Sequence, residues 1–389
     1  MLGRGPAFAL SAYAFAVTMA GTTLPTPLYP LYRERFGFSE LMITVIFATY
    51  AAGVIVALVL VGRLSDEIGR RPVLLPALAL SALSAVAFLL AQGLVPLLVG
   101  RVLSGFSAGI FTGTATATLV DIAPPRRRGR GTLVATAANM GGLGCGPLLA
   151  GLLAQYGSDP LRLPFWVDLA LLVPAALAIV AMPEPVSASP NPRLRPQALR
   201  VPAQIRAVFI RAALAGFAGF AVMGLFTAVS PAFLGTTLHI TNLAVIGLIV
   251  FAVFAASTAG QLAFDLVGER SMPIGCGGLI AGMGLLALGL ALPSLAFLVV
   301  GGVVAGLGQG LSFRAGLAGV NAAAPPEERA EVASSFFVVA YLAISVPVIG
   351  VGLLAEAAGL RTAGLVFAAV VAGIAAVVLA LLARRPKSG

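Results

Sequence analysis

Long apolar runs separated by short polar stretches make up almost the whole chain. A helix of about 20 apolar residues crosses a bilayer core about 30 Å thick, and windows of about 19 residues detect twelve runs of that length. The chain is therefore predicted to be an all-α membrane protein. The predicted spans are residues 7–29, 40–62, 72–92, 94–118, 131–155, 163–182, 207–230, 241–264, 272–292, 294–319, 331–357 and 361–383.

The first run also has features of a secretory signal. Arg4 precedes it, and Ala-Phe-Ala stands at positions 14–16, where a cleavage site would lie. The apolar run continues through Met19 and Leu24, however, which makes it long enough to span a membrane. We therefore interpret it as the first membrane helix.

Composition supports this interpretation and excludes several classes of protein. Of 389 residues, 59% are hydrophobic and 10% are charged, whereas a soluble domain carries about 25% charged residues. Cys145 and Cys276 lie in apolar runs and His239 is the single histidine, so we expect no disulfide framework, no metal site, no cofactor and no enzyme activity. The net charge is +10, but the basic residues stand between apolar runs and not on one face of a soluble domain, so we expect no nucleic acid partner.

The basic residues predict the orientation of the chain. Most Lys and Arg residues fall at the two ends and in the connections that follow even-numbered spans, so both termini are predicted to be cytoplasmic. The basic run at 126–130 is a topology anchor or a contact with anionic lipid headgroups. Abundant Ala, Gly, Arg and Pro with one Lys suggest a bacterial source with GC-rich DNA, and therefore a location in the bacterial inner membrane. Four arginines are predicted to lie outside: Arg33, Arg35, Arg162 and Arg361.

The two halves of the chain repeat each other at an offset of about 201 positions. Gly105 and Gly109 align with Gly306 and Gly310, and Ala-Pro-Pro recurs in matching connections. We therefore predict two six-helix halves that enclose a cavity at mid-depth, which suits alternating access better than a fixed channel. The predicted halves are residues 1–182 and 207–389, joined by a Pro-rich, solvated cytoplasmic linker at 183–206.

A compact motif follows the second span and contains Gly62, Asp66, Gly69, Arg70 and Arg71. Glycine at position 62 allows close helix approach, and glycine at position 69 allows a tight turn. The carboxylate at position 66 is predicted to accept hydrogen bonds from the next helix and to pair with the arginine at position 70.

This spacing resembles the signature of the major facilitator superfamily between its second and third helices. The resemblance implies a twelve-helix fold in which these residues latch the halves on the cytoplasmic side. Asp121, at the cytoplasmic end of the fourth span, is expected to pair with Arg70 or Arg71. The second-half copy has one extra residue between Gly260 and Asp265, and Glu269 replaces a basic residue, so a weaker latch is expected there.

A glycine-rich motif lies in the fifth span. Gly142 and Gly146 form a smooth packing face, and Pro147 removes a helical hydrogen bond. With Gly151, these residues resemble the motif that marks antiporters within the superfamily, although Ala150 replaces one glycine. The resemblance implies efflux by antiport.

Three charged residues are predicted to lie deep within spans and are the candidates for transport, because a charge at membrane depth costs at least about 2.5 kcal/mol. Arg101 faces a cavity or snorkels to the outer surface, and it resembles the helix-four arginine that the superfamily associates with proton coupling. Asp168 carries protons or anchors the interface beside Trp166. Arg314 has Gly113 at the equivalent first-half position, and an unrepeated charge favours a function in transport.

Together these features predict a secondary active transporter that works as a monomer in the lipid bilayer. The main hypothesis is proton-coupled efflux of a small amphiphilic molecule bound between spans one, four, seven and ten. Protonation at Asp168, in exchange with its interaction with Arg101, would then bias the chain between its inward-facing and outward-facing states. The alternative is transport of an anionic or sugar-like metabolite, because Arg101 and Arg314 both carry positive charge. The first span contains no acid, which argues against cation specificity, and no ATP-binding motif is present.

Overall fold

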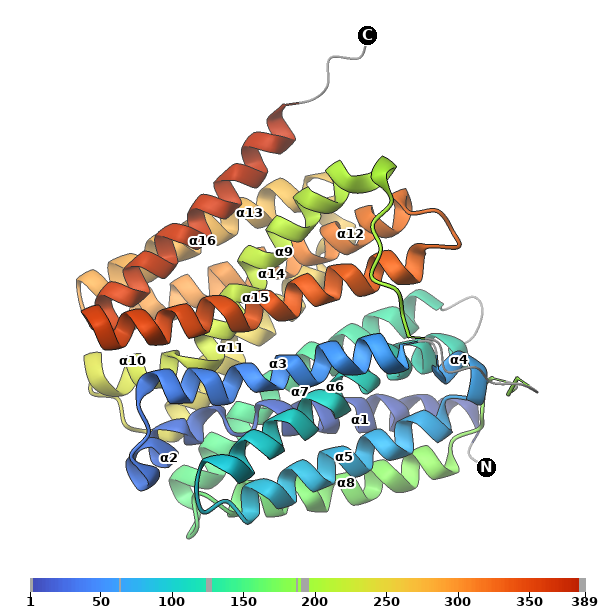
Figure 1. Cartoon of the computed structure of the whole chain (residues 1–389), viewed down its shortest axis with the longest axis horizontal. Coiled ribbons are helices and arrows are strands. Elements are labelled where there is room, and N and C mark those ends of the chain that lie inside the picture. Colours follow the sequence, from blue (N-terminus) through green and yellow to red (C-terminus); the bar gives the residue numbers. More distant parts are fainter. Residues whose placement is uncertain (1–2, 63, 124–127, 187, 190–195, 385–389) are drawn as a thin grey trace. The chain divides into compact units, whose positions relative to one another are not determined.

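The structure is a computed structural model that describes residues 3–62, 64–123, 128–186, 188–189 and 196–384 (Figure 1). All regular elements in these ranges are helices. Within them, twelve helical segments are long and apolar enough to cross a membrane. The predicted all-α membrane fold is therefore confirmed. Residues 126 and 127 of the basic run at 126–130 and part of the Pro-rich linker lie outside the described residues.

The helices follow the predicted spans closely. In the first part of the chain they are α1 (Arg4–Thr23), η1 (Thr26–Leu28), α2 (Tyr29–Phe36), α3 (Glu40–Val61), α4 (Leu64–Ile68), α5 (Arg71–Leu89), α6 (Leu94–Ile122), α7 (Arg128–Tyr156) and α8 (Leu163–Ala181). In the second part they are η3 (Ala203–Ile205), α9 (Arg206–Ala228), α10 (Ser230–Thr237), α11 (Leu243–Leu262), α12 (Phe264–Val267), η4 (Gly268–Arg270), α13 (Ser271–Ala291), α14 (Leu295–Ala323), α15 (Arg329–Ala358) and α16 (Leu360–Ala383).

The first span differs from its prediction. A single helix over 7–29 is wrong, because α1 ends at Thr23 and the chain continues through η1 and α2 to Phe36. Pro25 and Pro27 lie at this break, and proline cannot donate the backbone hydrogen bond that a continuous helix needs. Gly37 then ends α2 in the left-handed conformation, with φ of 69°.

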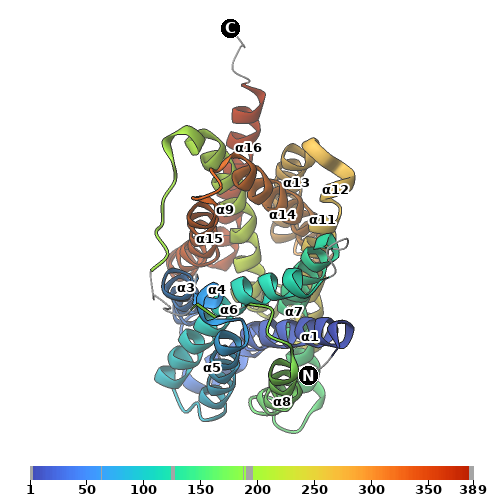
Figure 2. The same cartoon turned by 90° about the vertical axis from the view of Figure 1, so that its right-hand side faces the viewer.

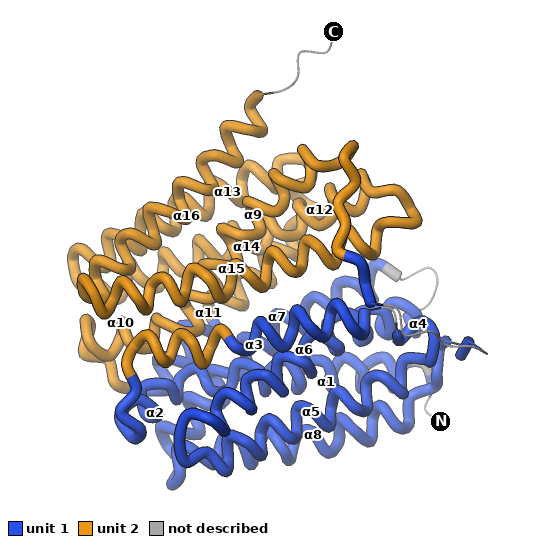
Figure 3. The backbone as a smooth tube through the Cα atoms, viewed as in Figure 1, with its two compact units in different colours: residues 1–38, 49–198, 242–251 blue, residues 39–48, 199–241, 252–389 orange. Residues whose placement is uncertain are grey.

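The chain forms two compact units (Figure 3). Unit 1 contains residues 1–38, 49–198 and 242–251, and unit 2 contains residues 39–48, 199–241 and 252–389. Each unit thus includes a short segment from the other half of the sequence. The sequence boundaries at 183 and 206 stay a prediction.

Helix packing within unit 1 repeats within unit 2. In unit 1, α1 packs against α6, α7 and α8, while α5 packs against α6 and α8. In unit 2, α9 takes the place of α1 against α14, α15 and α16, and α13 takes the place of α5 against α14 and α16 (Figure 2). This correspondence agrees with the internal duplication seen in the sequence.

The repeated glycines have equivalent packing roles in the two units. A Cβ atom at Gly105 or Gly109 would collide with backbone atoms of α3, at Tyr50 and Val54 respectively. A Cβ atom at Gly306 would likewise collide with backbone atoms of α11. Glycine at these positions lets each pair of helices approach at backbone distance.

The linker is held against unit 1 at the positions that the structure describes. The backbone N–H of Ser189 donates to the carbonyl of Glu67 over 2.7 Å, and that of Gln197 donates to the carbonyl of Val59 over 2.6 Å. The Gln197 side chain is buried. These contacts differ from the fully solvated hinge expected from composition, because specific backbone bonds offset the loss of water.

Candidate functional site

Arg70 is the centre of the motif that follows the second span, and we call its hydrogen-bonded cluster with Ser65, Asp66, Asp121 and Glu184 the latch. Its Nη1 atom donates to Ser65 Oγ over 2.7 Å and to Asp66 Oδ1 over 2.6 Å. Its Nη2 and Nε atoms donate to Asp121 Oδ2 over 3.0 and 3.2 Å. Arg70 is 7% exposed, so these charge-assisted bonds fix its position. The expected pairing of Asp121 is found with Arg70.

Glu184 performs the helix-capping role that the sequence suggested for Asp66. Its two carboxylate oxygens accept hydrogen bonds from the backbone N–H groups of Arg70 and Arg71, over 2.7 and 2.8 Å. These groups lie at the N-terminus of α5, where a carboxylate is favourable. Sequence reasoning missed this residue, although it is the single acid in the linker and follows the end of α8 closely.

Two glycines complete the latch with different roles. Gly69 has φ of +101°, which confirms the tight turn, and a Cβ atom there would lie 3.0 Å from the Glu184 carboxylate. Gly62 does not face another helix: outside its own helix, the nearest neighbour of a Cβ atom would be Gln197 at 3.6 Å. The close helix approach predicted for Gly62 is therefore wrong.

The second copy of this motif forms no comparable cluster. Asp265, Glu269 and Arg270 are exposed, and none of them joins a salt bridge in the part of the chain that the structure describes. This difference agrees with the weaker latch that the sequence predicts.

Arg101 is buried in unit 1 between α6 and α1. It is 1% exposed, and its Nη1 atom donates to the carbonyl oxygen of Thr22 over 2.5 Å. Its guanidinium carbon lies 4.8 Å from the ring centroid of Tyr50, a cation–π distance. This position is opposite to the snorkelling interpretation, because the guanidinium is turned into the protein.

Asp168 approaches the same turn of α1 from the other neighbouring helix, α8. It is 4% exposed, and a Cβ atom at Gly21 would lie 3.0 Å from Asp168 Oδ2. Trp166, two residues earlier, is exposed, so Asp168 does not share its interfacial position. The carboxylate and the Arg101 guanidinium thus contact consecutive residues of α1, Gly21 and Thr22.

The glycine motif of α7 contacts the same part of α1. A Cβ atom at Gly142 would collide with the backbone of Ala16, and one at Gly146 would collide with the carbonyl of Ala20 and with Thr23 Oγ1. The Thr23 hydroxyl donates to the carbonyl of Leu143 over 2.7 Å. We call residues 16–23 the α1 hub, because α6, α7 and α8 all converge on it.

The second half of the α7 motif contacts a different helix. A Cβ atom at Gly151 would meet the Leu243 carbonyl, and the carbonyl of Pro147 occupies the space beside Gly247. Both contacts join α7 to the first residues of α11, which belong to unit 1. The motif therefore provides two close helix contacts on one helix.

Arg314 is separate from these residues. It lies on α14 in unit 2, is half-buried, and has its guanidinium carbon 5.9 Å from the ring centroid of Phe264. The structure therefore brings Arg101 and Asp168 to one place within unit 1 and leaves Arg314 in the other unit.

Unit 2 contains a buried neutral cluster that the sequence did not reveal. The Ser257 hydroxyl donates to Gln309 Oε1 over 2.5 Å, and Gln261 Nε2 donates to Ser257 Oγ over 3.5 Å. Gln309 is fully buried, and its Nε2 has no hydrogen-bond partner among the described residues. The sequence feature that could have indicated this cluster is Gln309, a polar amide side chain inside the predicted span 294–319.

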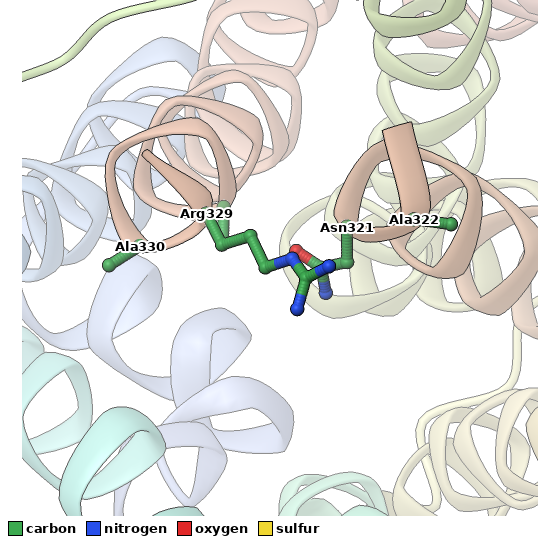
Figure 4. Close-up of a pocket in the computed structure, with 5 residues that line it drawn as sticks. Asn321, Ala322, Arg329 and Ala330 are labelled. Carbon is green, nitrogen blue, oxygen red and sulfur yellow. The ribbon is translucent and has the colours of Figure 1, made fainter. Parts of the chain in front are cut away.

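A cavity of about 580 Å³ lies where α14 ends and α15 begins. Asn321 and Arg329 point toward each other across it from the two helices, and three alanines complete its lining (Figure 4). Arg329 Nε also donates to the carbonyl of Ala324 over 3.4 Å. None of the predicted site residues lines this cavity.

Comparison with known proteins identifies similar sequences and folds. A stretch of 186 residues is 31% identical to an uncharacterised MFS-type transporter of Mycobacterium tuberculosis, covering 47% of this chain and 27% of that protein. A stretch of 182 residues is 25% identical to the quinolone resistance protein NorA of Staphylococcus aureus, covering 46% of each chain. The chain thus spans less than half the length of these curated relatives.

The fold extends over the whole chain. The crystal structure of a bacterial homologue of the human lysosomal transporter Spinster superposes with a TM-score of 0.76 at 15% identity, covering 99% of both chains. The profile described as Major Facilitator Superfamily matches residues 11–289. Together with the twelve spans and the latch motif, this match shows that the chain belongs to the major facilitator superfamily of membrane transporters.

Proposed function

We propose that this protein exports a small amphiphilic molecule in exchange for protons, with Asp168 as the proton carrier. The observation that carries the proposal is that two buried ionisable side chains, Arg101 and Asp168, contact consecutive residues of α1. A buried charge within a membrane span normally marks an ion or substrate pathway.

The two residues differ in how their charge is stabilised. The Arg101 guanidinium has a carbonyl acceptor and an aromatic face, which together suit a permanent positive charge. Asp168 forms no salt bridge among the described residues, so its buried carboxylate is least costly when it is neutral. Loss of its proton therefore favours a conformation in which water or Arg101 reaches the carboxylate, and this preference couples proton release to the transport cycle.

The glycine motif of α7 supports antiport, because it packs α7 tightly against the α1 hub. Gly142 and Gly146 place α7 at backbone distance from the helix that separates Arg101 from Asp168. A tight contact of this kind transmits a displacement of α1 to α7 with little loss, because closely packed helices move as discrete bodies. Similarity to a protein named for quinolone resistance supports efflux and an aromatic, amphiphilic substrate.

The test uses purified protein in liposomes that contain a pH-sensitive dye. Addition of a quinolone or ethidium against an imposed pH gradient should release protons through the wild type, and Asp168→Asn should abolish this proton flux while the protein still folds. Asp159→Asn is the matched control, because it makes the same chemical change at an exposed position in the connection that precedes α8. Proton flux that persists in Asp168→Asn would contradict the assignment of the carrier.

A second candidate is transport of an anionic or sugar-like metabolite. Arg314 favours it, because this half-buried arginine lies in a span, faces an aromatic ring and joins no salt bridge among the described residues. Arg314→Ala should then strongly weaken uptake or release of an organic anion and leave ethidium export unchanged. Unchanged anion transport in this variant would exclude the second candidate.

A further inference from the structure

A second cavity, which we call the Tyr32 cavity, lies in unit 1 at the end of the helices opposite the latch. Its volume is about 180 Å³, and its wall includes Tyr32, Arg35, Phe88, Gln92 and Arg162. α5 starts at the latch and ends beside this cavity, and α8 starts beside it and ends near Glu184. The basic-residue distribution predicts that this end lies on the outer side of the membrane.

The charge of the Tyr32 cavity is positive. Arg35 and Arg162 approach it from α2 and from the residue before α8, and its described lining contains no acidic side chain. Neither arginine joins a salt bridge among the residues that the structure describes. Glu34 and Asp159, the nearest acids in sequence, are exposed and lie outside the lining.

These two arginines are costly to place outside by the rule that sets topology. Arginine in short outer connections opposes the orientation that the remaining basic residues favour. Only four arginines are predicted to lie outside, and two of the four line this single small cavity. Both side chains are exposed, so water screens the repulsion between them. A shared anionic ligand explains why both line one cavity, because each guanidinium group can donate hydrogen bonds to it.

Tyr32 forms a rigid apolar part of the wall. Its ring stacks on Phe36 at 6.2 Å and lies 6.4 Å from the ring of Phe88, so its orientation is set by packing. The side chain is 1% exposed and its hydroxyl is buried, so a ligand in the cavity meets the arginines and not this hydroxyl.

We propose that the Tyr32 cavity binds a phosphate group, held by the guanidinium groups of Arg35 and Arg162. Guanidinium groups bind phosphate oxygens in pairs, and a phosphate presents enough oxygens for two guanidinium groups together. Drug-sized ligands occupy pockets of about 300–1,000 Å³, so this cavity suits a single small group. The phosphate is supplied by free inorganic phosphate or by a phospholipid headgroup of the outer leaflet.

The test measures thermal unfolding of the purified full-length protein in detergent, titrated with inorganic phosphate against chloride at constant ionic strength. Saturable stabilisation by phosphate is expected for the wild type. Arg35→Gln and Arg162→Gln should each weaken the apparent affinity about tenfold, whereas Tyr32→Phe, which removes a buried hydroxyl and keeps the ring packing, should leave it unchanged. Arg361→Gln is the control, because it removes an exposed arginine that lies in unit 2.

A parallel titration distinguishes the two sources of phosphate. Short-chain phosphatidylglycerol should stabilise the wild type, and phosphatidylcholine should serve as the comparison lipid. Stabilisation by the lipid without stabilisation by inorganic phosphate would identify a headgroup site, and the reverse result would identify a free anion. The proposal fails if neither ligand stabilises the wild type beyond chloride, or if the Arg35→Gln, Arg162→Gln double variant binds as the wild type does.

Discussion

The two copies of the connection between α3 and α5, and between α11 and α13, begin from related sequences and form different structures. In the first copy, Asp66 and Arg70 are four residues apart and form a salt bridge of 2.6 Å. In the second copy, the same spacing joins Asp265 to Glu269, two acids that repel each other. A change of charge sign at the turn, together with the lack of a counterpart to Asp121 and Glu184 in a salt bridge among the described residues, therefore separates the latch from an exposed connection.

The same contrast extends into the spans. At the repeat offset, Arg101 of unit 1 corresponds to Gly302 of unit 2, where a Cβ atom would collide with the ring of Phe226. Unit 2 instead buries the neutral pair of Ser257 and Gln309. The packing glycines at 105 and 109 recur at 306 and 310, whereas the buried charged residues discussed above lie in unit 1, which is why the proposed proton carrier is assigned there.

Removal of the latch arginine should have the largest effect. Arg70→Gln leaves Asp121 without its two guanidinium bonds and should lower the free energy of unfolding by about 3 kcal/mol. In the second copy Glu269 stands at the position of Arg70, and the one arginine, Arg270, corresponds to Arg71; Arg270→Gln should alter the free energy of unfolding by less than about 0.5 kcal/mol because that side chain is exposed and joins no salt bridge among the described residues. Thermal unfolding in detergent measures both. Equal losses would remove the distinction between the copies.

The α1 hub should tolerate almost no increase in side-chain size. Gly142→Ala places a methyl group against the backbone of Ala16, which cannot move aside, and should cost about 2 kcal/mol. At the repeat offset, unit 2 already has alanine, at position 343, and it is fully buried there. The matched control is Gly141→Ala, whose new methyl group meets no atom within 4 Å and should be neutral or stabilising. Similar melting temperatures for the two variants would refute the close contact.

The cap on α5 should contribute a moderate amount. Glu184→Gln keeps one acceptor oxygen but removes the negative charge at the helix N-terminus, so the free energy of unfolding should fall by about 1 kcal/mol. Glu269→Gln should have no such effect, because this residue is exposed and accepts no hydrogen bond from a helix N-terminus among the described residues. Chemical denaturation at low and high salt provides the check, since the loss for Glu184→Gln should shrink as salt screens the helix dipole.

Sequence patterns predicted the features that depend on local spacing. The twelve spans follow from apolar length, the turn at Gly69 follows from its lack of a Cβ atom, and the pairing of Asp121 follows from opposite charge near one membrane face. Glu184 escaped prediction because the backbone groups that it binds lie 113 and 114 positions earlier in the sequence. The Pro-rich sequence around it also has no hydrophobic periodicity from which a structure could be predicted.

The depth of a charged side chain was equally hard to infer. Arg101 lies seven residues into its span, which allows both a buried and a snorkelling orientation. The choice depends on the Thr22 carbonyl and the Tyr50 ring, which only tertiary packing brings to it. The break in the first span at Pro25 could have been read from its prolines, but apolar length alone concealed it.

Reversal of one charge should give the second copy a weak form of the first. Glu269→Arg places opposite charges four residues apart, as in the latch, and should raise the free energy of unfolding by about 0.3–0.5 kcal/mol. The gain stays small because both side chains are exposed and no counterpart of Asp121 or Glu184 joins them in a salt bridge among the described residues. A double-mutant cycle with Asp265→Asn isolates the pair from the effect of net charge. A gain as large as the loss in Arg70→Gln would mean that charge sign alone, without burial, determines the strength of the latch.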